Sequence, residues 1–558
     1  GEKIIISGAV GSSEAFSSFT LPTGKSAQLS SVTAAGAITL VPPLTLTQET
    51  FLFSSEGGVS LNADVTGTFP LNISAGAGDI LVQSLGNSSA GVFLDTITLS
   101  GEAITLGGSV ATSTEKGSLT LTNSGTLTLE SGDVSLSGSL IQSGGGEVFV
   151  AKNITALGSI SFTDPVTLSG SSVLDAVSSI TLSSNLSAST DYDLSLISHA
   201  SSITTKGLGS SSLPLGSLTV SALSFFTPGD IVTQGKPITV QAPTRLNSSV
   251  SFDTTKAGDN SEGSQISFTQ EVEPTGAGMY SLILKAGASE ITLEGAVGAE
   301  NSLSSFSATG GSFTLPSLIQ TTGTLTLSGS SFLVEPTTLQ SGAALQAGTF
   351  DTKSSALAPQ SLSLVSSGGD VSFGALGLLS DPNSFTLQSI KVEGAVLTQT
   401  AGARAEGSID YSGSSIVLTG DLLSEFSSIA LKGPVTLSSD VTLSSAQFLD
   451  LQGSTIDGAY ALSVFSAAGK ISLSRIGSLE PPVSFVAKAP FVSLSDSITA
   501  ESFEIEADMT LSSDVELSAV SANGTLTGGV NSDSIASPRS VIASSPTLLT
   551  VSGVSRSV

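Results

Sequence analysis

The residues best suited to metal chemistry are carboxylates near the C-terminal end of the sequence. Glu501, Glu504, Glu506 and Asp508 form the densest acidic cluster in the chain. Side chains two residues apart on a strand share a face, so Glu504, Glu506 and Asp508 are expected to lie side by side. Oxygen ligands of this kind bind Ca²⁺, which makes these three residues a calcium candidate. We favour the alternative, a solvated acidic face, and expect no bound metal or cofactor.

Two closely spaced carboxylate pairs, Asp191 with Asp193 and Glu271 with Glu273, are candidates for the paired acids of glycoside hydrolysis. The single histidine, His199, would need an activated serine, and the sequence contains no G-x-S-x-G elbow. Cysteine and tryptophan are absent and there are only 4 tyrosines, so thiolate chemistry is excluded and sugar platforms are scarce. The sequence therefore predicts no catalytic residue, and we expect that the chain is not an enzyme.

Short alternating segments are the elements that must position any of these residues. In residues 117–138, Leu and Val alternate with Ser and Thr, and Asn, Gly or Asp interrupts the pattern after every four or five residues. A period of two predicts half-buried strands, and the interruptions have the chemistry of turns. No stretch combines a 3.6-residue apolar period with caps. The sequence predicts an all-β fold of many short strands with almost no helix.

One cassette recurs along the chain and consists of L-x-[LIV], six residues, [IV]-x-[LFVT], and then glycine. Its copies begin at Leu71, Leu194, Leu282, Leu362 and Leu462. Counted from the second strand, and including a partial copy at the N-terminus, the cassettes begin near positions 4, 80, 203, 291, 371 and 471. A closed propeller needs evenly spaced blades, whereas a solenoid tolerates insertions between its turns. We expect a parallel β-helix with about 20 residues per turn.

The boundaries follow from where the cassettes stop. We expect residues 1–536 to form a continuous β-solenoid, and residues 537–558, which lack the cassette, to form a linker or a ragged terminal coil. The segment 4–19 aligns without gaps onto 291–306, so the sequence starts inside a repeat. This suggests a segment of a longer repeat protein.

The copy in residues 457–485 reads D-G-x-x-x-L-x-V, G-x-I-x-L, I-G-S-L and V-S-F. This pattern resembles the degenerate repeats of filamentous haemagglutinin-like large exoproteins. The copy that begins at Leu194 is similar as well, with Gly209 and the segment 214–220 in the matching places. The resemblance extends over most of residues 1 to 530. It implies a right-handed parallel β-helix in a bacterial adhesin or scaffold that is secreted to the cell surface.

Charge limits the partners that the chain can have. The sequence has 18 Lys and Arg against 46 Asp and Glu, a net charge of −28, and its basic residues are scattered singly. Binding to nucleic acid requires a basic patch, so we expect no nucleic-acid partner. No apolar run reaches the roughly 18 residues of a transmembrane segment. The partners we expect are glycans or proteins on a host or neighbouring cell, and further copies of the chain.

Our leading hypothesis is a structural or adhesive rod segment of a large secreted or cell-surface bacterial exoprotein. One alternative is a self-assembling filament or sheath subunit. Another is a carbohydrate-binding or carbohydrate-cleaving β-helix, which requires carboxylates and aromatic rings on one face. Outward threonines, such as those at positions 120, 122, 126 and 128, are similar to the arrays of ice-binding solenoids, but they are not regular along the chain.

Overall fold

The chain is a parallel β-solenoid of about 25 turns. The computed structural model describes residues 3–86, 91, 93–113, 117–130, 132–378, 384–532 and 539–552. Within these ranges, the one helical segment is the 3₁₀ turn η2 (Lys256–Gly258). The predictions of a β-solenoid, of parallel strands and of almost no helix are confirmed.

Each turn contributes one short strand to each of three ladders. One turn consists of β20 (Ile160–Phe162), β21 (Val166–Leu168) and β22 (Ser172–Ala176). The next consists of β23 (Ile180–Leu182), β24 (Leu186–Ala188) and β25 (Leu194–Ser198). Their pairing is parallel and in register, with Ile160 opposite Ile180. These two positions are 20 residues apart, as the repeat analysis predicts.

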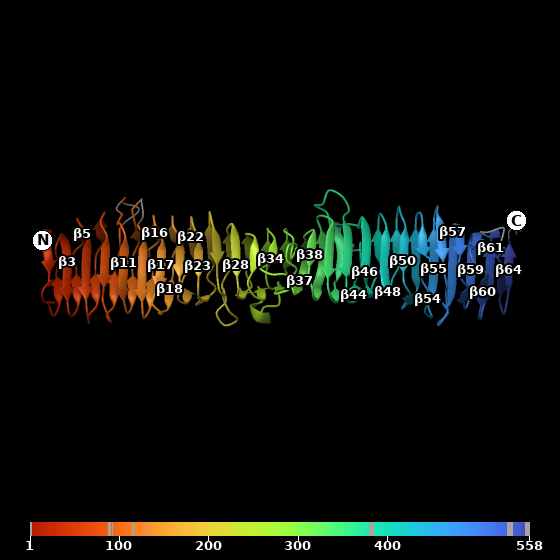
Figure 1. The fold of residues 1–558 in the computed structure, drawn as a ribbon, viewed down its shortest axis with the longest axis horizontal. Helices are drawn as coiled ribbons and strands as arrows, with labels where there is room; N and C mark the ends of the chain where they lie inside the picture. Colours follow the sequence, from red (N-terminus) through yellow and green to blue (C-terminus); the bar gives the residue numbers. More distant parts are fainter. Residues whose placement is uncertain are drawn as a thin grey trace. The chain divides into compact units, whose positions relative to one another are not determined.

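The described residues divide into two compact units. One comprises residues 1–275 with 279–290, and the other comprises residues 276–278 with 291–558. Within each unit, strands of successive turns lie side by side (Figure 1). In the range for which we expect a linker or ragged coil, β63 (Val541–Ser544) pairs with β60 (Val515–Ala519), and β64 (Leu549–Ser552) pairs with β61 (Gly524–Thr527).

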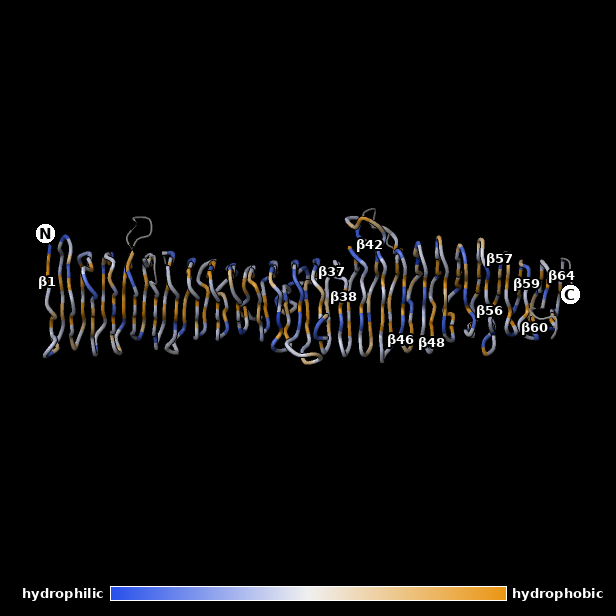
Figure 2. Tube along the Cα trace, turned by 45° about the horizontal axis from the view of Figure 1, so that its top comes forward, coloured by the Kyte–Doolittle hydropathy of each residue, from blue (hydrophilic) through white to orange (hydrophobic). Residues whose placement is uncertain are grey.

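The core of each unit is the stack of inward side chains. On β14 (Leu119–Asn123), Leu119 and Leu121 are fully buried, while the threonines that follow each of them are partly exposed. Figure 2 shows hydrophobic positions that recur in turn after turn. Aromatic rings fill the wider parts of the core, where Phe252 and Phe268 meet edge to face with centroids 4.9 Å apart. Dispersion and apolar burial summed over many such contacts stabilise the solenoid.

The glycine that closes each cassette has a conformational cause. Its φ lies between 67° and 75° in the copies at Gly86, Gly209, Gly298, Gly377 and Gly477. A Cβ atom at Gly209 would also lie 2.2 Å from the carbonyl oxygen of Val232 in the next turn. Only glycine accommodates both the left-handed backbone and this close approach, which explains why the cassette repeats it.

A polar network lies inside the first unit, among otherwise apolar turns. Gln142 on β17 (Leu140–Ser143) is fully buried, and its Nε2 donates to Asn123 Oδ1 at 2.8 Å and to Asp164 Oδ2 at 2.8 Å. Asn123 Nδ2 donates in turn to the Gly125 carbonyl at 2.7 Å, and Asp164 Oδ2 also accepts from the Gly145 amide at 2.8 Å. Buried amides need such partners, and here the partners come from three successive turns.

Aspartates just before strands link one turn to the next. The carboxylates of Asp421, Asp440 and Asp514 each accept the backbone amide of a residue one turn later, at 2.7 Å, 2.9 Å and 2.8 Å. The backbone and side-chain hydrogen bonds from Ser540 lower the pKa of Asp514 below its ordinary value. Two of these aspartates, Asp440 and Asp514, lie in segments that both read S-S-D-V. The shared contact explains this repeated sequence.

Several strands in the second unit are long and serve two ladders at once. The first part of β57 (Ser484–Leu494) pairs with β55 (Ala461–Ser466), and its last part pairs with β56 (Lys470–Leu473). Where β57 pairs with β59 (Phe503–Leu511), the register shifts between Lys488 and Phe491. Pro490 lies in this shift, where a missing amide donor is tolerated. The pairing of outward side chains therefore changes at this corner.

Candidate binding surfaces

The predicted calcium candidate is occupied by an ion-pair network. Lys488 Nζ lies 2.9 Å from Glu504 Oε1 and 3.4 Å from Glu506 Oε2. The hydrogen bonds that Lys488 Nζ donates to Glu504 and then to Glu506 raise the pKa of Lys488. Asp508 instead accepts the amide of Gly529 at 2.9 Å. Across the described ranges, no group of three or more His, Asp or Glu residues is placed to hold a metal ion.

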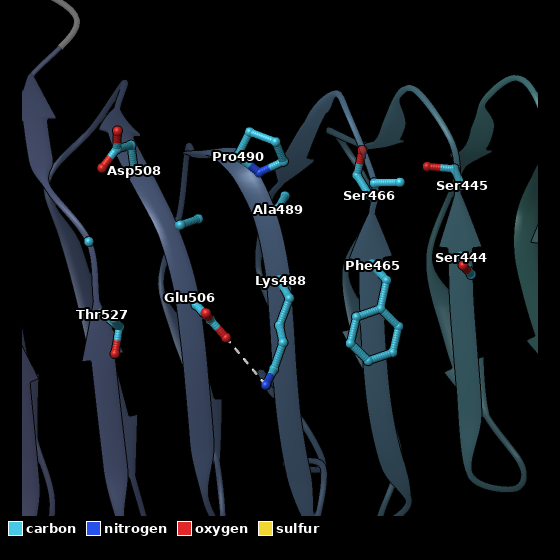
Figure 3. Close-up of a pocket in the computed structure, with 13 residues that line it drawn as sticks. Ser444, Ser445, Phe465, Ser466, Lys488, Ala489, Pro490, Glu506, Asp508 and Thr527 are labelled. Atoms are coloured by element: carbon cyan, nitrogen blue, oxygen red, sulfur yellow. Dashed lines mark ion pairs between the residues drawn. The ribbon is translucent and has the colours of Figure 1, made fainter.

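Lys488, Glu506 and Asp508 line an outer groove of about 650 Å³ in the second unit. Consecutive turns place Ser444, Phe465, Lys488, Glu506 and Thr527 opposite one another in a single row. Figure 3 shows this row crossing neighbouring strands, with the Lys488 side chain directed at Glu506. The groove offers an apolar ring, a cation and carboxylates for non-covalent recognition.

The other predicted acids are held by basic partners. Lys236 Nζ lies 3.4 Å from Asp191 Oδ2 and 3.7 Å from Asp193 Oδ1. Burial raises the pKa of Asp193, but hydrogen bonds from Ser217 and the charge of Lys236 outweigh it, and the net shift is downward. The general acid of a glycosidase needs a raised pKa, so Asp193 is poorly suited to that role.

Glu271, Glu273 and His199 also have partners. Glu271 Oε1 lies 3.4 Å from Arg245 Nη2, and Glu273 is buried on β34 (Val272–Pro274), opposite Arg245. His199 Nε2 lies 2.9 Å from Asp175 Oδ1, and its side chain is 58% exposed. An exposed hydrogen bond of this kind is what a solvated histidine makes. The structure does not bring these candidates together at one site.

A face that sequence reasoning missed lies on the first unit. Phe51 and Phe53 on β6 (Thr50–Ser54) point outward and are 46% and 44% exposed. They border a hollow of about 160 Å³, whose floor consists of residues on β9 (Leu71–Ser74) and β11 (Ile97–Gly101). The signal in the sequence is T-F-L-F-S, because period two places both rings on the side opposite the buried Leu52.

Two longer loops leave the turns at a shared F-D-T sequence. After Phe252 and Asp253, Thr254 Oγ1 accepts the amide of Ser264 at 2.9 Å and closes the base of the first loop. In the second unit, Thr352 Oγ1 does the same with the amide of Gln360 at 2.9 Å. Figure 2 shows the chain after β42 (Thr349–Lys353) projecting beyond its neighbours.

We call the two threonines that close a loop base, Thr254 and Thr352, the latch threonines. The aspartate that precedes each of them is buried. Asp253 accepts the amide and hydroxyl of Thr255, and Asp351 accepts the amide of Thr352 at 3.0 Å. Beyond the first latch, Lys256 has a positive φ of 52°, so the loop contains a strained backbone turn. Each latch allows a segment to leave the solenoid while the ladders on either side remain in register.

Comparison with known proteins gives no relative. No family model, no curated protein and no solved structure matches the chain. Among the described residues, no helix is long and apolar enough to cross a membrane. The strand pairing defines the fold class as a parallel β-solenoid. Its outer surfaces are the basis for any argument about function.

Proposed function

We propose that the chain is a structural and adhesive segment of a large bacterial exoprotein that acts at the cell surface. The observation that carries the proposal is the separation of roles between the two sides of each strand. Inward positions are apolar and stack from turn to turn, and outward positions are mostly short hydroxyl side chains. Such an architecture extends by adding turns, and it leaves the outer surface free to contact a partner.

Open surfaces and projecting loops favour an adhesive role in addition to a structural one. The groove around Lys488 and the hollow beside Phe51 are open surfaces, and surfaces of this kind suit a partner that lies along the solenoid. The two latched loops add projecting segments, and loops on a rigid scaffold commonly carry recognition. The net charge of −28 favours solubility outside the cell.

Surface labelling of intact cells tests the location. Antibodies raised against the purified chain are applied to intact and to permeabilised cells of the organism that encodes it. Labelling of intact cells, lost after brief treatment with external protease, supports the proposal. Labelling that requires permeabilisation contradicts it.

A binding assay tests the adhesive role. Immobilised chain is presented with whole cells, and bound cells are counted in the presence and absence of soluble chain. We expect retention that soluble chain inhibits. Sedimentation of the chain at several concentrations separates this outcome from the filament alternative, in which particle size grows with concentration and cells are not retained.

A further inference from the structure

The face around Phe51 and Phe53 spans several turns of the first unit. Ladder partners extend from Phe51 through Asn72, Thr98 and Thr120 to Ile141. Neighbouring strands are about 4.8 Å apart, so the four steps from Phe51 to Ile141 cover ~19 Å. Ile141 is 46% exposed and closes the face at its far end.

A parallel row continues the face from Phe53. Its members are Phe53, Ser74, Ser100, Thr122 and Ser143. Both rows consist of uncharged side chains in a chain whose net charge is −28. The charge beside the strip is the carboxylate of Glu49, whose Oε1 accepts from Asn72 Nδ2 at 3.2 Å. An anionic partner would find no compensating cation in either row.

The hollow beside the two rings is lined almost wholly by apolar surface, whereas the two ladder rows along the face bear hydroxyl side chains. Within the part of the chain that the structure describes, the side chains of Thr98, Ser100, Thr120 and Thr122 make no hydrogen bond. All four are partly exposed. A hydroxyl both donates and accepts, so these rows match a ligand that presents many hydroxyls of its own.

The two phenylalanines supply the apolar part of the site. They lie on one strand, two residues apart, and therefore face the same way. Single exposed apolar residues are common on protein surfaces, but two adjacent aromatic rings beside a hollow form a platform. The C–H faces of a sugar ring stack on an aromatic face, and its hydroxyls hydrogen-bond at the rim.

We propose that this face binds a neutral oligosaccharide, whose chain runs along the solenoid from Phe51 and Phe53 toward Ile141. Sugar rings stack on the phenylalanines, and the hydroxyls of Thr98 and Thr120 bond to those of the ligand. The inference deepens the adhesive part of the proposed function and rests on it only for its biological meaning, because binding is a property of the face itself.

Binding is tested with the full chain by titration calorimetry and saturation-transfer NMR. The probes are neutral pentasaccharides of glucose, mannose and N-acetylglucosamine, with a sulfated heparin pentasaccharide for comparison. We expect at least one neutral probe to bind. We expect Phe51→Ala and Phe53→Ala each to weaken its binding about tenfold, and the double variant to abolish it.

Matched variants separate the site from general surface effects. Phe426→Ala removes a ring that is 66% exposed in the other unit, and it should leave binding unchanged. The double variant Thr98→Val with Thr120→Val keeps the side-chain shape, removes two hydroxyls and should weaken binding. Far-ultraviolet circular dichroism and thermal unfolding confirm that each variant folds.

Four results overturn the inference. They are no binding of any neutral probe, binding that survives loss of both rings, tighter binding of the sulfated probe, and loss of self-association as the only effect of the double phenylalanine variant. The last result would assign the face to a second copy of the chain. Cell-surface labelling does not depend on any of these outcomes, so failure of this inference is distinguishable from failure of the proposed location.

Discussion

The buried network around Gln142 gives the sharpest prediction about stability. Replacement of Gln142 by Leu introduces an apolar side chain and removes both Nε2 bonds, at 2.8 Å to Asn123 and 2.8 Å to Asp164, together with the bond that Oε1 accepts from the Asp164 amide at 3.3 Å. Asp164 keeps its bond from the Gly145 amide, but Asn123 Oδ1 loses its Gln142 donor in a fully buried position. An unsatisfied buried acceptor costs about 1–3 kcal/mol. With the other bonds of Gln142 also lost, we expect the local stability of the first unit to fall by about 2–3 kcal/mol.

Global unfolding is a poor readout for a repeat protein, because its turns need not unfold together. Hydrogen exchange at the buried Gly146 amide is local and reports on the network, since its acceptor is the carbonyl of Asn123 at 3.0 Å. A loss of about 2–3 kcal/mol corresponds to exchange that is roughly 30- to 150-fold faster, at 1.4 kcal/mol per factor of ten.

The matched control is Gln447→Leu, which removes a solvent-exposed amide whose Nε2 donates to the Phe426 carbonyl at 2.9 Å. Its effect on exchange in its own turn should stay within about 0.5 kcal/mol. If Gln142→Leu changes exchange at Gly146 by no more than this control changes exchange in its own turn, the network does not stabilise the first unit as we argue.

Three further changes test the reasoning elsewhere. Gly209→Ala should destabilise the first unit by about 2 kcal/mol or more, because φ is 73° and the added Cβ meets the Val232 carbonyl at 2.2 Å; hydrogen exchange at the amide of residue 209, which donates to the Leu186 carbonyl at 2.7 Å, measures it, and wild-type exchange would contradict the clash. Tyr411→Phe should slow hydrogen exchange in its own turn, an effect worth about 1 kcal/mol, because the buried hydroxyl has no hydrogen-bond partner in the described structure; faster exchange would contradict this reasoning. The lowered pKa of Asp514 means that its contribution to stability is present above the unfolded value near 3.8 and is lost as the pH falls through the folded value. The protection factor of the Ser540 amide, the exchange rate of an unfolded peptide at the same pH divided by that of the amide itself, should therefore fall in acid, and Asp514→Asn, which keeps an acceptor oxygen, should remove that dependence.

The alternation of side chains was enough to predict the fold, but the rows on its outer surface were not predictable. Period two identifies which residues face inward, and cassette glycines mark corners that need a left-handed backbone. The neighbours along the solenoid depend on the length of each turn, which varies. Phe465 faces Lys488 across 23 residues, and Lys488 faces Glu506 across 18. A fixed repeat therefore could not place Lys488 between the carboxylates of the calcium candidate.

The aromatic face was missed for a related reason. Phe51 and Phe53 alternate with the buried Leu52, and in the sequence such a segment reads as an unusually apolar strand. Its meaning depends on the residues opposite it, and these come from turns that end more than 20 residues later. The sequence did not predict the F-D-T latches either, because each threonine bonds across a loop of different length.

The two sides of each strand place different demands on the sequence, and most positions of the solenoid are open to substitution. Inward positions accept any apolar residue of suitable size, since cores tolerate exchange among hydrophobic residues as long as volume and pattern persist. Outward positions contribute little to the ladder, because backbone hydrogen bonds hold neighbouring turns together whatever side chains they bear. Corner glycines, inter-turn aspartates and the buried Gln142 network are tied to particular chemistry. Such a chain can change most of its residues while every turn stays in place, so its binding surfaces are free to diverge faster than its architecture. Recognition should therefore reside in local features such as the Phe51 face and the latched loops, and replacing them should change what the solenoid binds without unfolding it.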